Sequence, residues 1–196
     1  LMQNACNITE KGVRRILSFI KPGVMEFEIE AELMHEFLRN RSKGFAYTPI
    51  VASGKNACVL HYIENNQMCN DGDVILMDFG TEYANYASDF TRCVPVNGRF
   101  SSRQKDVYNA VLRVKTAAEK LLIPGVFMAD YHVEVGKLME SELLGLGLID
   151  QTDINNQDPK WPAFKKYFMH GTSHCIGLDT HDLGLWTEPI KAGMAF

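Results

Sequence analysis

Three of the six histidines fall within twelve residues of one another. The stretch MHGTSHCIGLDTHD, residues 169–182, carries His170, His174 and His181 beside two glycines. A single histidine is more often structural than functional, but imidazoles gathered beside glycines, which let a ligand approach the backbone, favour a binding site. Because glycine disfavours a helix, we expect a strand or an irregular segment beside a cleft here.

Two aspartates in apolar surroundings form a second candidate group. Asp78 lies in VILMDFG and Asp89 in ASDFTR, on the two sides of a predicted hairpin, so their side chains should approach to about 5–7 Å. A buried carboxylate is costly without a cationic partner. Two neighbouring carboxylates repel until one is protonated or a divalent cation binds between them. The residues alone leave an alternative open, in which one aspartate caps a turn and the other pairs with Arg92.

The hydrophobic pattern predicts the elements that position these groups. Apolar positions at helical spacing predict helices at about 2–20, 26–39, 101–123 and 130–144. Short runs rich in Val, Ile, Tyr and Phe predict strands at 47–53, 57–63, 74–82 and 86–96, with a hairpin around 83–85 and a polar surface loop at 150–162. His61 falls in the second of these strands, whereas we interpret His35 and His132 as structural or surface residues in helices.

The tripeptide Pro-Gly-Val occurs at residues 22–24 and again at 124–126, each time between two predicted helices. The same order of elements follows each copy, which predicts an internal duplication with halves at about 1–98 and 99–196. The alternative is that Pro-Gly simply ends helices. Aligning Gly72 with Gly193 places the counterpart of Asp78 beyond the last residue, so we expect an incomplete second half. The two ends, at Leu1 and in an apolar run, lead us to expect a piece of a longer protein.

The composition narrows the class of protein. The chain has 196 residues, of which 46% are hydrophobic and 22% charged, with a net charge of -4, as expected for one soluble domain or two small halves. No basic run indicates a nucleic-acid partner, no apolar run reaches the ~20 residues of a membrane helix, and no signal peptide precedes the first helix, which predicts a cytoplasmic protein. Five scattered cysteines without a CxxC spacing predict free thiols in a reducing compartment.

Taken together, DFGTEYANYASDFTR and MHGTSHCIGLDTHDLG resemble the catalytic domain of the Xaa-Pro aminopeptidases. These enzymes are pita-bread metallopeptidases, like prolidase and methionine aminopeptidase, and the pattern HGxSHxxGLDxHD favours the proline-directed branch. The similarity extends over essentially the whole chain. It implies an α+β pita-bread fold, internally duplicated, with the second half truncated at its C-terminus, so that residues 1–196 form a partial catalytic domain.

The resemblance also implies roles for the candidate residues. Asp78 would bind one of two divalent metal ions, Asp89 would bridge both, and His174 would be the nitrogen ligand. Mostly carboxylate ligands with one imidazole suit Mn(II) best and tolerate Co(II), Fe(II) or Zn(II). The metals would share a hydroxide that attacks the carbonyl group preceding proline. The residues expected to bind the peptide substrate and to stabilise the charged intermediate are His61, His170 and His181.

The chain also departs from the family pattern. Two glutamate ligands that normally follow this region are missing, and Glu188, before Pro189 in an expected loop, is not assigned as a substitute. With three of five ligands, we expect this chain to bind metal weakly and to be inactive alone. The substrates implied are peptides with an Xaa-Pro N-terminus, and a homodimer is a further expectation from the family. The alternatives are a prolidase and a non-catalytic pita-bread module that binds peptides.

Overall fold

The computed structural model describes residues 1–184 and 186–196. The chain divides into two compact units, each of which is described by itself. Unit 1 comprises Leu1–Ser101 and Ile176–Asp182, and unit 2 comprises Ser102–Cys175 and Leu183–Phe196.

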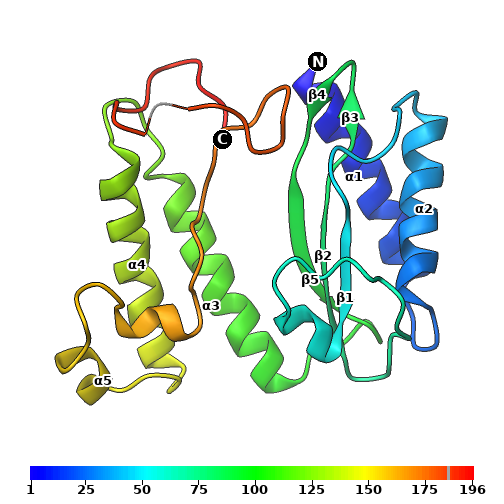
Figure 1. The fold of residues 1–196 in the computed structure, drawn as a ribbon. Helices are drawn as coiled ribbons and strands as arrows, with labels where there is room; N and C mark the ends of the chain where they lie inside the picture. Colours follow the sequence, from blue (N-terminus) through cyan, green and yellow to red (C-terminus); the bar gives the residue numbers. More distant parts are fainter. Residues whose placement is uncertain (185) are drawn as a thin grey trace. The chain divides into compact units, whose positions relative to one another are not determined.

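Unit 1 begins with two helices, followed by a three-stranded antiparallel sheet and a short hairpin (Figure 1). Strand β2 is central in the sheet order β1-β2-β5, and β3 pairs with β4 alone. The elements are α1 (Met2–Phe19), α2 (Glu26–Arg39), β1 (Ile50–Ser53), the 3-10 helix η1 (Gly54–Cys58), β2 (Val74–Phe79), β3 (Glu82–Tyr83), β4 (Tyr86–Ala87) and β5 (Phe90–Pro95).

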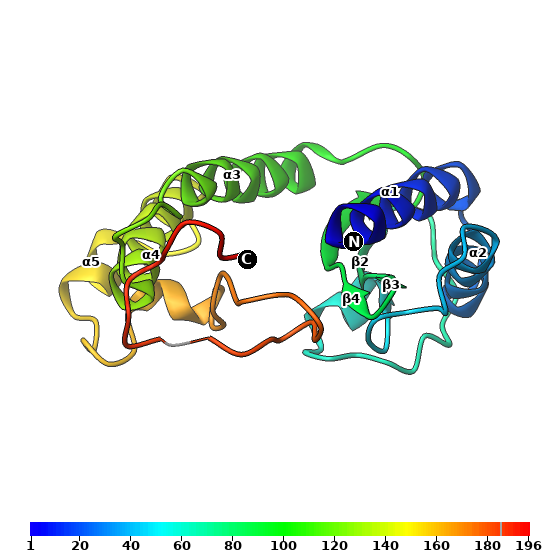
Figure 2. The same ribbon diagram turned by 90° about the horizontal axis from the view of Figure 1, so that it is seen from above.

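Helices α1 and α2 lie side by side against the sheet (Figure 2). Their apolar faces meet buried residues of the strands in one core, since an amphipathic helix must bury its apolar stripe against another element. A Cβ at Gly12 of α1 would lie 2.8 Å from the Phe37 ring of α2, so glycine permits the close approach of the two helices. The fully buried members of this core include Ile16, Ile29, Leu33, Phe37, Val51, Ile75 and Phe79.

Strand β2 separates an apolar face from a face that carries a carboxylate. Its residues alternate between half-buried and buried, and Ile75, Met77 and Phe79 belong to the core. Successive strand side chains point to opposite faces. Asp78 therefore lies on the face away from the core that the helices share.

The predicted long hairpin is present, but each of its two strands is interrupted, one between β2 and β3 and the other between β4 and β5. Ala84 and Asn85 form its turn, with positive φ angles of 52° and 70°, as in two-residue hairpin loops. Between β2 and β3, the Thr81 N–H donates to the hydroxyls of Thr9 and Ser88 instead of a strand partner. A Cβ at Gly80 would collide with the Ser88 carbonyl oxygen, so only glycine allows the two backbone segments to approach so closely.

The strand predicted at residues 57–63 is wrong. Residues Gly54–Cys58 form η1, and the chain then turns at His61, whose φ angle is 54°. Val59, Leu60 and Ile63 are all more than half exposed. The run has the composition of a strand, but Tyr62 is its one buried residue, so it lacks the alternating buried face that stabilises a strand.

Unit 2 is helical over its first half and irregular afterwards. Its elements are α3 (Ser102–Glu119), α4 (Met128–Gly145), α5 (Gln151–Asn155) and η2 (Ala163–Lys166). Asp150 and Asp153 form a capping box that starts α5 inside the predicted surface loop. In the described part of unit 2, the strands expected after α4 are absent, apart from an isolated bridge between Asp158 and Trp161.

The two Pro-Gly-Val joints have the same local structure. Gly23 and Gly125 have φ angles of 92° and 95°. The Gly23 N–H donates to Cys69 O and the Cys69 N–H to Val24 O, at 2.9 and 2.8 Å. In unit 2, Gly125 and Val126 exchange the same pair of hydrogen bonds with Ile190, both at 2.8 Å. Cys69 stands three residues before Gly72, and Ile190 stands three residues before Gly193, so the structure supports the alignment made from the sequence.

No helix of the described residues is both long enough and apolar enough to cross a membrane.

Candidate metal centre

Two carboxylates of unit 1 converge on one phenol. Tyr47 Oη lies 2.6 Å from Asp78 Oδ1 and 2.9 Å from Asp89 Oδ1. Asp78 stands opposite Thr91 in the β2–β5 ladder, and Asp89 immediately precedes β5, so the interrupted hairpin brings the two aspartates together. The expected proximity of Asp78 and Asp89 is therefore present, and the Arg92 guanidinium donates to Thr91 O at 2.7 Å.

The electrostatics of this cluster favour the uptake of a positive charge. Burial raises the pKa of Asp78, and the negative charge of Asp89 raises it further, against a lowering by the Tyr47 hydrogen bond. Burial and the charges of the two aspartates also raise the pKa of Tyr47, which therefore remains protonated. A hydroxyl has one proton, so with both carboxyls ionised one of the two contacts lacks a hydrogen.

The donor set fits a divalent cation. Carboxylate oxygens are ligands for hard and borderline divalent metals, and a cation between Asp78 and Asp89 would relieve the repulsion that raises the Asp78 pKa. Among the described residues, however, no three His, Cys, Asp or Glu side chains are gathered as a ready ligand group. The structure thus brings two carboxylates together, and their role as metal ligands, like that of the other expected ligands, stays a prediction.

A buried network of hydroxyls fixes the backbone next to Asp89. Ser88 Oγ lies 2.7 Å from Thr9 Oγ1 of α1 and donates to Thr81 O at 2.9 Å. Thr81 Oγ1 in turn lies 2.5 Å from Ser42 Oγ. All four residues are buried, and buried polar groups that satisfy one another hold a single arrangement. Helix α1 therefore helps to hold the residue that precedes Asp89.

His61 lies in the same unit, in the turn after η1. Its side chain is exposed, and its charge lowers the pKa of Asp78, which places the imidazole within electrostatic reach of that carboxylate. A non-glycine residue in the left-handed region is uncommon and must be held by its surroundings. The loop therefore presents His61 toward solvent on the side of Asp78.

The histidine-rich stretch is irregular, as expected, and it divides between the units. Residues Ile176–Asp182 belong to unit 1, where the Ala87 N–H of β4 donates to Gly177 O at 2.8 Å. Asp182 Oδ2 accepts from the Leu178 N–H at 3.0 Å, which closes the segment as a turn. The structure therefore places His181 in the unit that contains Asp78 and Asp89.

His170 and His174 belong to unit 2. His170 is exposed, and its ring meets the Phe168 ring edge-on at 5.5 Å between centroids. His174 is half-buried, and its Nδ1 lies 3.0 Å from Cys175 O. The proposed role of His174 as a metal ligand and that of His170 in substrate binding remain predictions.

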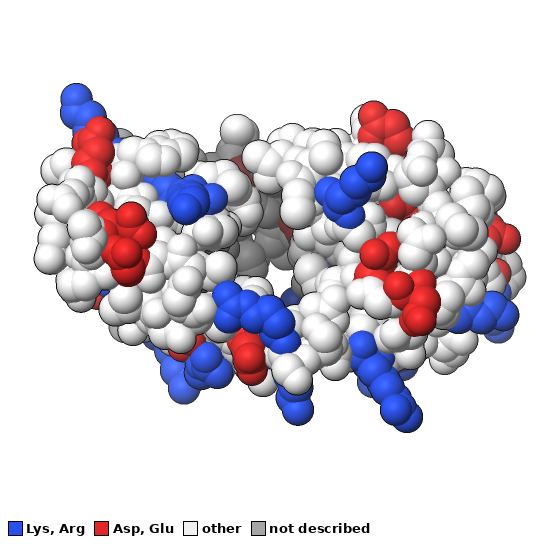
Figure 3. All heavy atoms as spheres, turned by 90° about the horizontal axis from the view of Figure 1, so that it is seen from below, with Lys and Arg blue, Asp and Glu red and all other residues white. Residues whose placement is uncertain are grey.

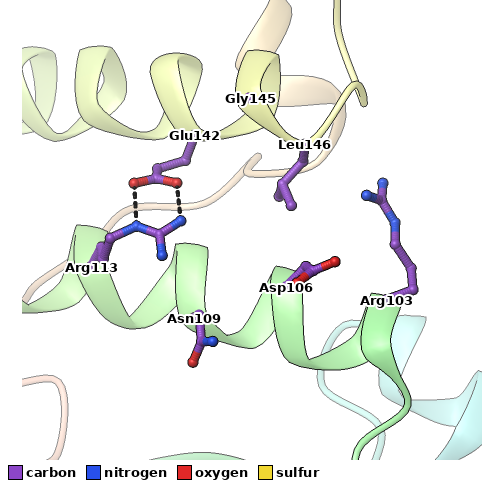
Figure 4. Close-up of a pocket in the computed structure, with 7 residues that line it drawn as sticks. All are labelled: Arg103, Asp106, Asn109, Arg113, Glu142, Gly145 and Leu146. Carbon is purple, nitrogen blue, oxygen red and sulfur yellow. Dashed lines mark hydrogen bonds and ion pairs between the residues drawn. The ribbon is translucent and has the colours of Figure 1, made fainter.

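A separate cavity of about 320 Å³ lies between α3 and α4 of unit 2 (Figure 4). Arg113 of α3 and Glu142 of α4 face each other there as a bidentate ion pair, at 2.7 and 2.6 Å. None of the residues predicted from the sequence lines this cavity. Basic and acidic side chains are interspersed on the face drawn in Figure 3.

Comparisons with known proteins identify the family. The sequence profile described as metallopeptidase family M24 matches residues 1–196. The chain belongs to metallopeptidase family M24. This match covers both joints, both aspartates and the histidine-rich stretch.

The relatives of this M24 chain carry consistent names. It is 41% identical over 191 residues to a Haemophilus influenzae protein named Xaa-Pro aminopeptidase, and 38% identical over 190 residues to an Escherichia coli protein of the same name. These alignments cover 96% of this chain, but 43% and 42% of those proteins. The chain thus spans less than half the length of the relatives it matches.

Solved structures confirm the fold class. The chain superposes on zinc-substituted Escherichia coli aminopeptidase P in complex with product with a TM-score of 0.91 at 37% identity. It superposes on Pseudomonas aeruginosa aminopeptidase PepP with a TM-score of 0.89 at 37% identity. Each match covers 98% of this chain and 44% of the other. The predicted α+β pita-bread fold is confirmed.

Proposed function

We propose that this M24 chain is part of an aminopeptidase that releases the first residue from peptides with proline in second position. One observation carries the proposal: the Asp78 and Asp89 carboxylates converge on the Tyr47 hydroxyl, at 2.6 and 2.9 Å. The names of the relatives, at 41% and 38% identity, support the substrate class.

The proposed ligands of two divalent cations are Asp78, Asp89 and His174. Their mostly carboxylate character favours Mn(II). Cations of this kind lower the pKa of water and stabilise negative charge that develops on oxygen. Tyr47 would keep the two carboxylates oriented, because groups that hydrogen-bond to metal ligands fix their geometry.

The remaining histidines would act on the peptide. His61 and His181, in the unit of the two aspartates, would donate hydrogen bonds to the substrate and to the oxygen that becomes charged when its carbonyl group is attacked. The resemblance assigns His170 of unit 2 to the same task. An imidazole suits it because it can serve as donor or acceptor near neutral pH.

The 196 residues supply three of the five metal ligands that the resemblance implies. We therefore propose that this chain alone binds metal weakly and has no peptidase activity. The first half, about residues 1–98, and the second half, about 99–196, would be two copies of one ancestral unit, of which the second is incomplete here.

The test is an assay of residue release from an Xaa-Pro tripeptide, with and without Mn(II). It compares the protein at the full length of its relatives with the 196-residue chain and with Asp89→Ala. Asp106→Ala, an exposed aspartate of α3, is the matched control. We expect metal-dependent release by the full-length protein and by the control, and none by the other two.

Three outcomes would change the proposal. Release from an Xaa-Pro dipeptide but not from the tripeptide would indicate a prolidase. Absence of release with any divalent metal, in a folded full-length protein, would indicate a non-catalytic peptide-binding module. Full activity of the purified 196-residue chain would show that its three ligands suffice.

A further inference from the structure

One buried carboxylate lies outside the proposed metal centre, below the loop that carries His61. Glu26, the first residue of α2, is fully buried. It accepts four hydrogen bonds, which is enough to make a buried carboxylate tolerable. The donors are the Ser53 N–H at 2.7 Å, the Tyr62 hydroxyl at 2.7 Å, the Gln67 N–H at 3.0 Å and Asn56 Nδ2 at 3.2 Å.

One of these four donors immediately precedes residues 54–67, which we call the His61 loop, and the other three lie within it, the last at its final residue. One carboxylate therefore fastens both ends of the loop and its middle. Tyr62 is 7% exposed although its neighbour His61 is exposed. The buried phenol thus anchors the loop at the residue next to the imidazole.

Asn65 is a second anchor of the His61 loop. Its side chain accepts from the Val51 N–H of β1 and donates to Pro49 O and Glu30 Oε2, each at 2.9 Å. Asn65 and His61 both have positive φ angles, 44° and 54°. Such angles persist outside glycine only where the surrounding contacts over-determine them. The conformation of His61 is therefore imposed by the anchors on its C-terminal side.

The second half of the chain shows that the joint itself does not require a carboxylate. The residue 102 positions after Glu26 is Met128, which is likewise the first residue of a helix after a Pro-Gly-Val joint and is 4% exposed. An apolar side chain therefore suffices to begin the helix at this joint. What Glu26 adds is the set of hydrogen bonds to the His61 loop and its borders.

We propose that Glu26 is a positioning residue, which acts through Tyr62 to hold His61 where it meets the peptide substrate. The inference rests on the proposed peptidase function for the last step, the contact of His61 with substrate. Burial raises the pKa of Tyr62 to about 12, so its hydroxyl remains a donor to Glu26 throughout the neutral range.

The first test is hydrogen exchange of the 196-residue chain, which needs no activity. Glu26→Gln and Tyr62→Phe should each speed exchange of the Val59 and Gln67 amides, at least about tenfold, while β2 and β5 keep their protection. Glu28→Gln is the matched control, because this glutamate lies in the same helical turn and accepts from the Met25 N–H. Unchanged exchange in the loop, or equal acceleration throughout unit 1, would overturn the inference.

The second test is a double-mutant cycle in the full-length protein. Tyr62→Phe should lower kcat/KM by about tenfold in the native background and have no further effect on His61→Ala, because a positioning residue acts through the group it positions. An equal loss in both backgrounds would overturn the inference. If the unsubstituted protein releases no residue while the loop still responds in hydrogen exchange, the peptidase proposal fails and the anchoring of the loop stands.

Discussion

The Tyr47 hydroxyl is the residue-scale feature that most directly links structure to metal binding. Because it contacts both carboxylates, we expect Tyr47→Phe to weaken Mn(II) binding about tenfold, as is typical when a group that orients metal ligands is lost. Isothermal titration calorimetry of the full-length protein measures the change. Tyr86→Phe, in β4 of the same unit, should leave the affinity unchanged, and equal affinity in all three proteins would contradict the proposed role of Tyr47.

His132 leads to a second prediction at this scale, on how the free energy of unfolding depends on pH. Its Nε2 is buried without a hydrogen-bond partner among the described residues, and burial lowers its pKa from the usual 6.5. Below pH 6.5 the unfolded chain therefore binds a proton that the folded chain excludes, so this residue lowers the free energy of unfolding as the pH falls.

The variant His132→Leu removes this titration. Between pH 8 and pH 5, roughly the range over which histidine titrates, it should lose less of its free energy of unfolding than the native chain does. Urea denaturation at several pH values measures both curves, and His35→Leu is the matched control in α2. Parallel curves for the native chain and His132→Leu would contradict the prediction.

The two aspartates could be predicted from the sequence, but their shared partner could not. A carboxylate in an apolar strand is costly to bury, so Asp78 was a candidate, although the residues alone left a structural role open. Tyr47 stands in a segment without regular structure, and Asp78 lies 31 positions further along the chain. No spacing rule connects them, so only the folded chain reveals the contact.

At the scale of elements, the sequence predicted the helices and the joints better than the strands. Helices α1 and α2 coincide with their predicted spans, because their amphipathic period extends over many residues. The run at 57–63 is rich in strand-forming residues, but the hydrogen bond from Tyr62 to Glu26, and that from the nearby Asn65 to Pro49 O, hold the chain in another conformation. Such contacts come from distant parts of the chain and override local preference.

The packing of α1 on α2 leads to a prediction about glycine. Gly12→Ala should lower the free energy of unfolding by about 1–2 kcal/mol, because the steric cost of overpacking a core, ~1–3 kcal/mol, exceeds the gain in helix propensity, ~1 kcal/mol. The new methyl group would lie 2.8 Å from the Phe37 ring and 3.1 Å from Leu33, both fully buried.

The matched control is Gly145→Ala at the end of α4, where an added Cβ meets nothing within 4 Å. This substitution should leave stability unchanged or raise it by less than ~1 kcal/mol. Thermal and urea denaturation of the two variants give the comparison. A stabilised Gly12→Ala chain would show that the helices separate easily and that the α1–α2 contact is loosely packed.

At the scale of the whole molecule, the chain contains two units that share one kind of joint. The paired hydrogen bonds of Gly23–Cys69 and Gly125–Ile190 repeat, whereas the sheet of unit 1 has no counterpart in the described part of unit 2. The sequence indicated the shared joint because this joint is short and uses glycine in a left-handed conformation. It could not predict the conformation of the described residues after α5, because that conformation depends on packing against the rest of the chain rather than on a local sequence pattern.

The five cysteines offer a probe of unfolding for the whole chain. All are free; Cys6 and Cys58 are exposed and Cys69 is buried. Burial raises the pKa of the Cys69 and Cys93 thiols, and the thiolate is the reactive form.

We therefore expect two thiols to react rapidly with Ellman's reagent at pH 8. The buried Cys69 and the half-buried Cys93 should follow at least about tenfold more slowly, because their thiols become accessible when unit 1 opens. The Cys6→Ser/Cys58→Ser double variant should lose the rapid phase and keep the slow one. In guanidinium chloride, all five thiols of the unsubstituted chain should react in one rapid phase.

Cys69 and Cys93 both belong to unit 1, which also contains Asp78 and Asp89. A divalent metal that binds these aspartates stabilises the folded state, so it should slow the reaction of the two thiols in proportion. If saturating Mn(II) does not change the rate of the slow phase in the full-length protein, the metal binds elsewhere.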